Sequence, residues 1–433
     1  MFEWYRGGSR EEKKTFWACY LGWALDSFDT QIFSFLLPTL LATWSLSKGA
    51  AGAIGTVSLS TAAIGGWFAG IVSDRIGRVT VLRLTVLWFT LFGVLAGFAT
   101  SYEQMLIARA LQGFGFGGEW AVGAALMAEV TRPEHRGRAL GFVQSGFCLG
   151  WIGAVLMATW ALSYFPHPLG WRVAFWIGVA PAFVILLVRM RIRESHMFKQ
   201  VAQEARAHKA TLTSVFKPEY LRTSLFSSLM VLGLQAAGYV VAVWIPSLLA
   251  ERGVNPRSLI VSILVMAVGA FCGFAFTASS CDKWGRRPTL TGMILCCGGV
   301  TLAYMFVPGN PFLIQFLGFL VGFFVIGIFA AVGPYLSELF PTRVRTTCMG
   351  FCYNVAKTLA ALAIAGVGVL STHIGLATAI GATCFASYAI SIVALLALPE
   401  TKGVDLAELD AGVSVRCEVL GPTSSVNVTG RAR

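Results

Sequence analysis

The stretch that decides the fold is Trp23-Ala24-Leu25-Asp26-Ser27-Phe28-Asp29-Thr30-Gln31-Ile32-Phe33-Ser34-Phe35-Leu36-Leu37-Pro38, inside an apolar run over 16–44. At about 1.5 Å per residue, a helix of this length crosses a bilayer. Asp26 and Asp29 interrupt it, and a charge near the bilayer centre costs at least ~2.5 kcal/mol. Both should therefore face protein or water, and their spacing of three places them on one helix face. We expect functional acids, with structural hydrogen bonds to a neighbouring helix as the alternative.

The composition indicates a membrane protein with many spans. The chain has 433 residues, of which 56% are hydrophobic and 12% charged, and its mean hydropathy is +0.71. A soluble core cannot absorb so many long apolar runs. We therefore predict an all-α membrane protein with twelve transmembrane helices. The predicted spans are 16–44, 49–73, 79–99, 103–129, 138–162, 171–190, 223–250, 257–280, 288–306, 311–338, 345–372 and 376–398.

The distribution of basic residues predicts the topology. With both termini in the cytoplasm, most of the 33 Lys and Arg residues lie on the cytoplasmic side. This asymmetry follows the positive-inside rule. The net charge of +12 therefore reflects topology and contact with anionic lipids, and we expect no nucleic-acid partner. The basic residues placed outside are Lys48, Arg172, Arg252 and Arg257, and those placed within spans are Arg109 and Lys357.

The loops contain an internal repeat. Asp74-Arg75-Ile76-Gly77-Arg78 follows the second span, and Asp282-Lys283-Trp284-Gly285-Arg286 follows the eighth, 208 residues later. A second element, a Glu followed seven residues later by an Arg, recurs after 209 residues. Two independent elements with nearly the same displacement indicate duplication of a six-span unit, an architecture found in transporters. We predict two bundles, 1–190 and 223–400, joined by a cytoplasmic linker, 191–222, and followed by a cytoplasmic tail, 401–433.

These loop charges predict a gate that holds the cytoplasmic ends of the bundles together. We expect Glu129 to pair with Arg136. Glu338 should pair with Arg345 in the same way. Near each glycine turn an aspartate can pair with a nearby arginine, and the alternative is that these residues only fix loop geometry. The residues assigned to the gate are Asp74, Arg75, Arg78, Glu129, Arg136, Asp282, Arg286, Glu338 and Arg345.

The chain resembles the major facilitator superfamily over residues 15 to 403. The resemblance rests on the two loop motifs, on Arg109-Ala110-Leu111-Gln112-Gly113-Phe114-Gly115-Phe116-Gly117-Gly118-Glu119, and on the endings Glu338-Leu339-Phe340-Pro341-Thr342-Arg343-Val344-Arg345 and Pro399-Glu400-Thr401-Lys402-Gly403. It implies two six-helix bundles and alternating access. The motifs around Asp26 and Glu119 are similar to those of the sialate, aromatic-acid and lactate proton symporters. In those relatives Gly or Ala is common at the position of Ser27.

The fifth span favours symport over antiport. Antiporters of the superfamily tend to carry a Gly- and Pro-rich motif there. Here the span reads Gly141-Phe142-Val143-Gln144-Ser145-Gly146-Phe147-Cys148-Leu149-Gly150-Trp151-Ile152-Gly153, with glycines for close helix packing but no proline.

Depth in the membrane predicts a site near the midplane. Asp26 lies ~15 Å and Asp29 ~20 Å from the cytoplasmic start of their span, and Arg109 lies at about the level of Asp29. We expect Asp29 to form a structural ion pair with Arg109, and Asp26 to carry the coupling proton. Glu119, placed on the Arg109 face, could pass that proton toward the cytoplasm. The candidate substrate-binding residues from both halves are Arg109, Gln112, Gln235, Tyr353, Asn354 and Lys357.

These patterns favour a multi-pass inner-membrane transporter that imports a small organic anion by proton symport. It should be no enzyme and hold no cofactor, should take its energy from the proton gradient, and should function as a monomer. One alternative is a facilitator or proton symporter of neutral sugars, suggested by the sugar-porter-type endings. Another is a transporter-like nutrient sensor, which the short tail after Glu400 disfavours.

Overall fold

The computed structural model describes residues 3–45, 48–166, 169–198, 200, 212–253, 256–306 and 310–406, and their regular secondary structure is entirely helical. Much of the predicted linker, 201–211, and most of the predicted tail, 407–433, lie outside these residues.

The first half of the chain begins with a short helix and a capped long one. Ser9 and Glu12 form a reciprocal capping box at the start of α2: the Glu12 amide donates to the Ser9 hydroxyl at 3.1 Å, and the Ser9 amide donates to the Glu12 carboxylate. The helices of this half are α1 Glu3–Arg6, α2 Arg10–Trp44, α3 Lys48–Ile76, α4 Arg78–Gly97, α5 Tyr102–Val130, the 3₁₀ helix η1 Pro133–His135, α6 Arg136–Tyr164, α7 Leu169–Gly178 and α8 Ala180–Met190.

The second half repeats this order of long helices. Its elements are the 3₁₀ helix η2 Leu212–Phe216, α10 Pro218–Glu251, α11 Pro256–Trp284, α12 Arg286–Met305, α13 Pro311–Val321, the π-helix η3 Gly322–Ile326, α14 Phe329–Leu339, α15 Arg345–Ile374 and α16 Leu376–Leu396.

Two predicted spans are interrupted helices. The sixth is divided into α7 and α8 at Val179, just before Pro181. The tenth passes through the π-helix η3, where α11 comes so close that a Cβ atom on Gly322 would lie 2.0 Å from the Met266 carbonyl oxygen. A π-helical turn widens the helix locally and is frequent at functional sites.

Ten segments in the described part of the chain are long and apolar enough to cross a membrane. Two of them are the interrupted spans, Leu169–Met190 and Pro311–Leu339, each taken as a whole. The helices α2, with 35 residues, and α5, with 29, are as long but carry charged side chains among their apolar ones. The protein is therefore a multi-pass membrane protein.

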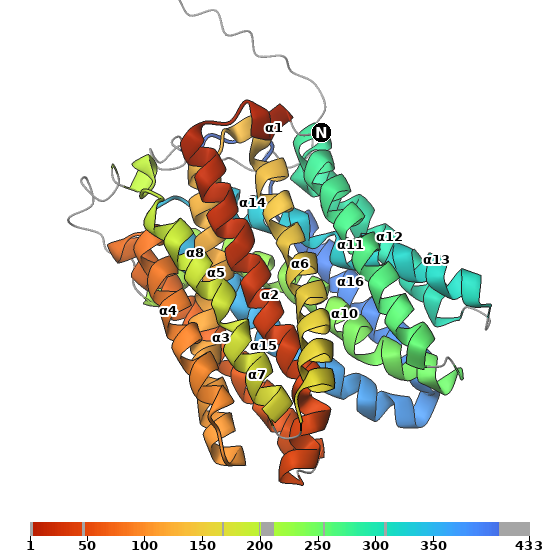
Figure 1. Cartoon of the computed structure of the whole chain (residues 1–433). Helices are drawn as coiled ribbons and strands as arrows, with labels where there is room; N and C mark the ends of the chain where they lie inside the picture. The colour runs from red at the N-terminus through yellow and green to blue at the C-terminus, as the bar shows by residue number, and fades with distance from the viewer. Residues whose placement is uncertain are drawn as a thin grey trace, which may run out of the picture.

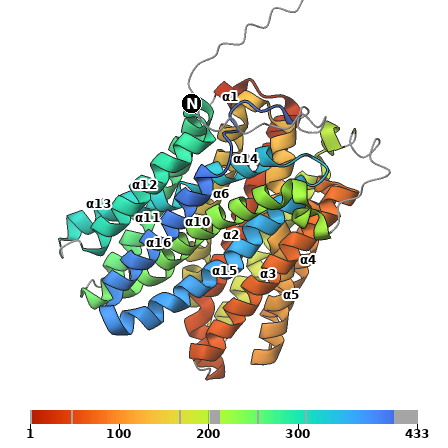
Figure 2. The same cartoon turned by 180° about the vertical axis from the view of Figure 1, so that it is seen from behind.

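The helices form two groups that meet along α3, α5 and α6 on one side and α11, α14 and α15 on the other. Figures 1 and 2 show the groups close together at the end where α1 lies and farther apart at the opposite end. Small residues allow the close approach. A Cβ atom on Gly141 of α6 would lie 2.4 Å from that of Ala278 in α11. We call the closed end, where α3 turns into α4 and α11 into α12, the latch end.

Candidate functional site

Asp29 lies in a compact polar cluster inside the first half. Its Oδ2 atom lies 3.0 Å from Nη1 of Arg109 and accepts a hydrogen bond from Nε2 of Gln112 at 2.9 Å. Arg109 also donates to the Gln112 amide oxygen at 2.6 Å and lies over the Phe33 ring at 4.5 Å. Gly93 of α4 leaves room for the cluster, because a Cβ atom there would be 2.8 Å from Gln112 Nε2. The expected ion pair is present, and it uses two of the six candidate substrate-binding residues.

Asp26 has different surroundings, one turn earlier on the same helix. Within the described residues its buried Oδ1 atom has no hydrogen-bond partner. The strongest electrostatic influence on it from another side chain is the positive charge of Lys357, on α15 in the other half. Lys357 is half-buried and has no ion pair with any residue that the structure describes. The structure thus brings an acid and a base from opposite halves to one region.

Aromatic side chains close this region toward the latch end. Trp120 of α5 and Tyr353 of α15 stack across the interface between the halves, with ring centroids 3.7 Å apart and an interplanar angle of 16°. The Trp120 indole donates to the Gln144 side chain at 3.1 Å. Tyr353 lies within electrostatic range of Asp26 and of Tyr239 on α10. The two stacked rings are buried, and they join the halves beside the two charged groups.

Two other candidate substrate-binding residues hold helices together. Gln235 of α10 donates to the Tyr353 carbonyl oxygen at 3.1 Å and is 2% exposed. Asn354 donates to the Gly350 carbonyl oxygen of its own helix at 2.9 Å. It also packs against α3, where a Cβ atom on Gly66 would lie 2.2 Å from its Nδ2 atom. Both residues therefore fix the position of α15, which carries Tyr353 and Lys357.

Glu119 forms a buried ion pair with Arg189, which lies at the end of the predicted sixth span and was not among the candidate site residues. Two hydrogen bonds, of 2.9 and 2.6 Å, join the guanidinium of Arg189 to the carboxylate of Glu119. The Thr85 hydroxyl donates to the same carboxylate. Gly22 makes the pair possible, because a Cβ atom there would lie 2.0 Å from Arg189 Nη2. Since α8 runs on to Met190, it carries Arg189 to the level of Glu119.

At the latch end, the predicted pairs between a glutamate and the arginine seven residues later are wrong. Glu129 pairs with Arg345 of the other half at 3.0 Å, and also with Arg78 at 3.1 Å. Glu338 pairs with Arg136 of the other half at 3.1 Å, in the reciprocal arrangement. The partners are exchanged because both arginines also donate to carbonyl oxygens eight residues before them, which directs them across the interface.

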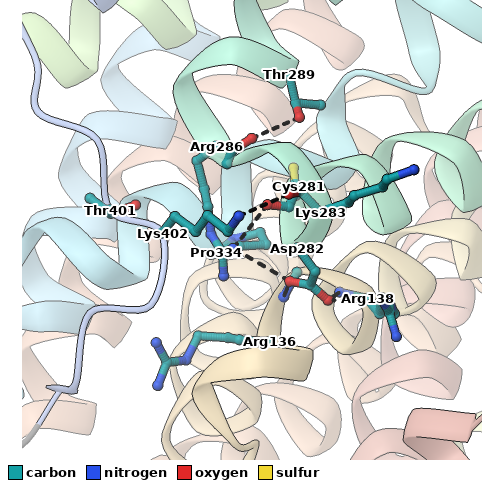
Figure 3. A network of polar contacts seen from close by, with 12 residues as sticks. Arg136, Arg138, Cys281, Asp282, Lys283, Arg286, Thr289, Pro334, Thr401 and Lys402 are labelled. Carbon is teal, nitrogen blue, oxygen red and sulfur yellow. Dashed lines mark hydrogen bonds and ion pairs between the residues drawn. The ribbon is translucent and has the colours of Figure 1, made fainter.

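The two aspartates of the turn motifs also bind across the interface. Asp74 accepts from the amide and the hydroxyl of Thr347, at 2.8 and 2.7 Å. Asp282 accepts from the amides of Gly137 and Arg138, at 2.9 and 3.0 Å. Figure 3 shows Asp282 between Arg286 of its own half and Arg138 of the other, to which it forms ion pairs of 3.4 and 3.6 Å.

Each aspartate pairs in addition with the arginine four residues later, Asp74 with Arg78 at 3.1 Å and Asp282 with Arg286. Arg286 also binds Glu338, at 2.8 Å. Arg75, the other assigned gate residue, is exposed at the end of α3.

The glycine turns are completed by two acids that the assignment of gate residues left out. Gly77 and Gly285 both have φ of 106°. Glu194 accepts from the amides of Arg78 and Val79 at the start of α4, at 2.9 and 3.0 Å. Glu400 accepts from Arg286 and Arg287 in the same way at the start of α12, at 2.9 Å each. A carboxylate at a helix N-terminus satisfies amides that have no partner within the helix.

Comparisons with known proteins bear on the family and the fold. A family model described as the Major Facilitator Superfamily matches residues 19–365. A "Probable 4-methylmuconolactone transporter" of Cupriavidus pinatubonensis is 58% identical over 414 residues, covering 95% of this chain and 96% of that protein. A cis,cis-muconate transport protein of Acinetobacter baylyi is 29% identical, covering 85% and 89% of the two chains. A solved structure of the proton:xylose symporter XylE, bound to 6-bromo-6-deoxy-D-glucose, shares the fold with a TM-score of 0.77, at 20% identity, over 94% of this chain and all of that one.

Proposed function

Because the chain belongs to the major facilitator superfamily, we propose that it imports a small organic anion together with protons. The family and the names of the relatives make it a transporter and not an enzyme. The observation that carries the proposal is the meeting of Asp26 and Lys357 from opposite halves. Sites between the two repeats, near the bilayer midplane, are where such transporters bind substrate.

We propose that the chain crosses the inner membrane twelve times, with both termini in the cytoplasm. The ten apolar segments, together with α2 and α5, supply these spans. The acids and bases in α2 and α5 face protein partners, which makes these two helices compatible with the bilayer. The positive-inside distribution supports the orientation, and it makes the latch end the cytoplasmic end.

The substrate that we propose is a carboxylate with a flat, unsaturated body. Lys357 supplies the positive charge, and the stacked rings of Trp120 and Tyr353 supply apolar, aromatic surroundings beside it. Two relatives are named for a muconolactone and for cis,cis-muconate, which are unsaturated carboxylates. We infer that this chain accepts a compound of the same chemical class.

We propose that coupling arises because Asp26 and the substrate carboxylate compete for one positive charge, that of Lys357. While Asp26 is ionised, its charge offsets that of Lys357 and repels an incoming carboxylate. When Asp26 binds a proton, that repulsion disappears and Lys357 becomes available to the substrate. The loaded carrier then reorients by rocking of the two halves, which opens the latch end. The proton gradient supplies the energy, no cofactor is needed, and a monomer suffices because both halves belong to one chain.

Lys357→Ala tests this proposal. We expect the apparent KM for cis,cis-muconate or 4-methylmuconolactone to rise at least roughly tenfold, because an anion in a low dielectric loses its main partner. The measurement is uptake of labelled substrate into proteoliposomes with an imposed pH gradient. Lys357→Arg is the matched control, since it keeps the charge. Normal affinity in Lys357→Ala would contradict the anion site, and neutral-sugar uptake insensitive to a protonophore would favour the sugar alternative.

A further inference from the structure

A basic cavity of about 220 Å³ lies at the latch end of the first half, between the start of α2 and the segment after α8. Arg10 and Lys14, one turn apart on α2, line one side, and Arg191 and Arg193 line the other. Two carboxylates, Glu11 and Glu194, also line it. Four cations thus face two acids.

Most of this positive charge is not neutralised within the protein. Among the residues that the structure describes, the side chains of Arg10, Lys14 and Arg191 form no hydrogen bond or ion pair. Arg193 lies 4.0 Å from Glu11, in a pair that is largely exposed. The Glu194 carboxylate is occupied by the amides at the start of α4. Burial also raises the pKa of Glu194, against the hydrogen bonds from the α4 amides that lower it.

Glu194 and Ser195, which line the cavity, are held in place by hydrogen bonds within the protein. Ser195 donates to Glu129 of the latch at 2.6 Å, and Glu194 is fixed against α4. A lining that is already ordered loses little conformational entropy on binding.

An exposed apolar surface begins directly beside the cavity. Phe183, Val184, Leu187 and Met190 lie along one side of α8, and each is between 57% and 63% exposed. Met190 immediately precedes Arg191. A ligand with an anionic head and apolar chains therefore matches both surfaces at once, whereas a free anion matches only the cavity.

We propose that this cavity binds the phosphodiester headgroup of an anionic phospholipid, whose acyl chains lie along the exposed side of α8. Basic clusters beside a transmembrane helix attract anionic lipids by about 1 kcal/mol for each Lys or Arg.

The test is lipid binding by the purified full chain, measured by native mass spectrometry with phosphatidylglycerol and phosphatidylcholine. We expect one tightly bound phosphatidylglycerol and no matching phosphatidylcholine. Arg10→Gln/Arg191→Gln should weaken phosphatidylglycerol binding roughly 30-fold. The matched control is Lys217→Gln/Arg222→Gln, which removes the same charge from two exposed residues at the start of α10. This variant should bind phosphatidylglycerol within about twofold of the unaltered chain.

Single variants and competition by a soluble phosphate ester complete the test. Should the double variant fail to fold, Lys14→Gln and Arg193→Gln provide the same comparison, each with a roughly fivefold loss. An equal loss in the control pair would mean general surface charge and would overturn the site. Soluble glycerol phosphate should not displace the lipid at matched concentration. If it does, the site takes a free phosphate ester and the lipid assignment is wrong.

Discussion

Asp26 and Asp29 show how two identical side chains, one helical turn apart, acquire different chemistry. Asp29 has an ion pair with Arg109 and a hydrogen bond from Gln112. Asp26 has an oxygen without a hydrogen-bond partner in the described structure and one cation, Lys357, that belongs to the other half. Under the proposed mechanism, Asp29, which its own bundle holds, keeps its partners, whereas Asp26, which faces the other half, can change them.

Asp26→Asn should therefore uncouple transport without abolishing it. With an imposed pH gradient, we expect the internal substrate concentration to rise only to the external one, because the amide cannot take up and release the proton. Counterflow without a gradient should persist, since exchange needs only the loaded carrier to reorient. In proteoliposomes, labelled uptake measures accumulation and counterflow measures exchange. Continued accumulation against the gradient would move the coupling role to another acid.

Glu119 and Arg189 should behave as a structural pair rather than as part of a proton path. Breaking a buried pair leaves one charge without its partner, at a cost of about 3–5 kcal/mol. We expect Glu119→Gln to lower the unfolding temperature strongly. The apolar double variant Glu119→Leu/Arg189→Met should recover much of that loss, because it leaves no buried charge. Thermal unfolding of the purified variants measures this, and a stable Glu119→Gln with lost coupling would restore the proton-path role.

At the scale of elements, the two glycine turns govern how α3 enters α4 and α11 enters α12. Gly77 has φ of 106° and ψ of 152°, a backbone region that is essentially restricted to glycine. A Cβ atom there would also lie 2.4 Å from a Glu194 oxygen, which binds the start of α4. The turn and its cap therefore depend on each other.

Gly77→Ala should destabilise the protein more than the same change at Gly375. Gly375 has a similar backbone, with φ of 78° and ψ of 153°, but a Cβ atom there meets nothing within 4 Å. The backbone strain of about 1–3 kcal/mol is common to both variants, whereas the clash with Glu194 belongs only to Gly77. Thermal unfolding of both variants makes the comparison. Equal losses would show that the Glu194 cap contributes little.

At the scale of the whole molecule, the latch is a set of reciprocal contacts between the two repeats. Glu129 of the first half binds Arg345 of the second, and Glu338 of the second binds Arg136 of the first. All four side chains are at most 3% exposed. If the halves rock apart as proposed, opening the latch end must separate both pairs.

A double-mutant cycle should reveal this exchange of partners. We expect Glu129→Gln and Arg345→Gln to be strongly coupled, by roughly 1–3 kcal/mol in unfolding free energy. Glu129→Gln and Arg136→Gln should be additive within about 0.5 kcal/mol. Reversible denaturation of the single and double variants in one detergent gives both values. The opposite pattern would mean that each glutamate binds the arginine of its own half.

The sequence by itself determined the class of protein, the approximate helix bounds and the duplication. These are recorded locally, in long apolar runs and in motifs repeated at a fixed displacement. It also predicted the pair between Asp29 and Arg109, because depth along two helices is enough to bring them level.

The pairs of Asp74 with Arg78 and of Asp282 with Arg286 also follow from the sequence, but only the tertiary structure decided the partners of Glu119, Glu129 and Glu338. Seven residues separate Glu129 from Arg136 in the chain, yet Arg345, 216 residues away, is its partner. Arg189 lies at the end of an apolar run with no acid near it in the sequence, but packing of α8 against Gly22 brings it to Glu119. The physical reason is that a buried charge takes the partner that the docking of helices presents to it, and nearness along the chain does not decide that contact.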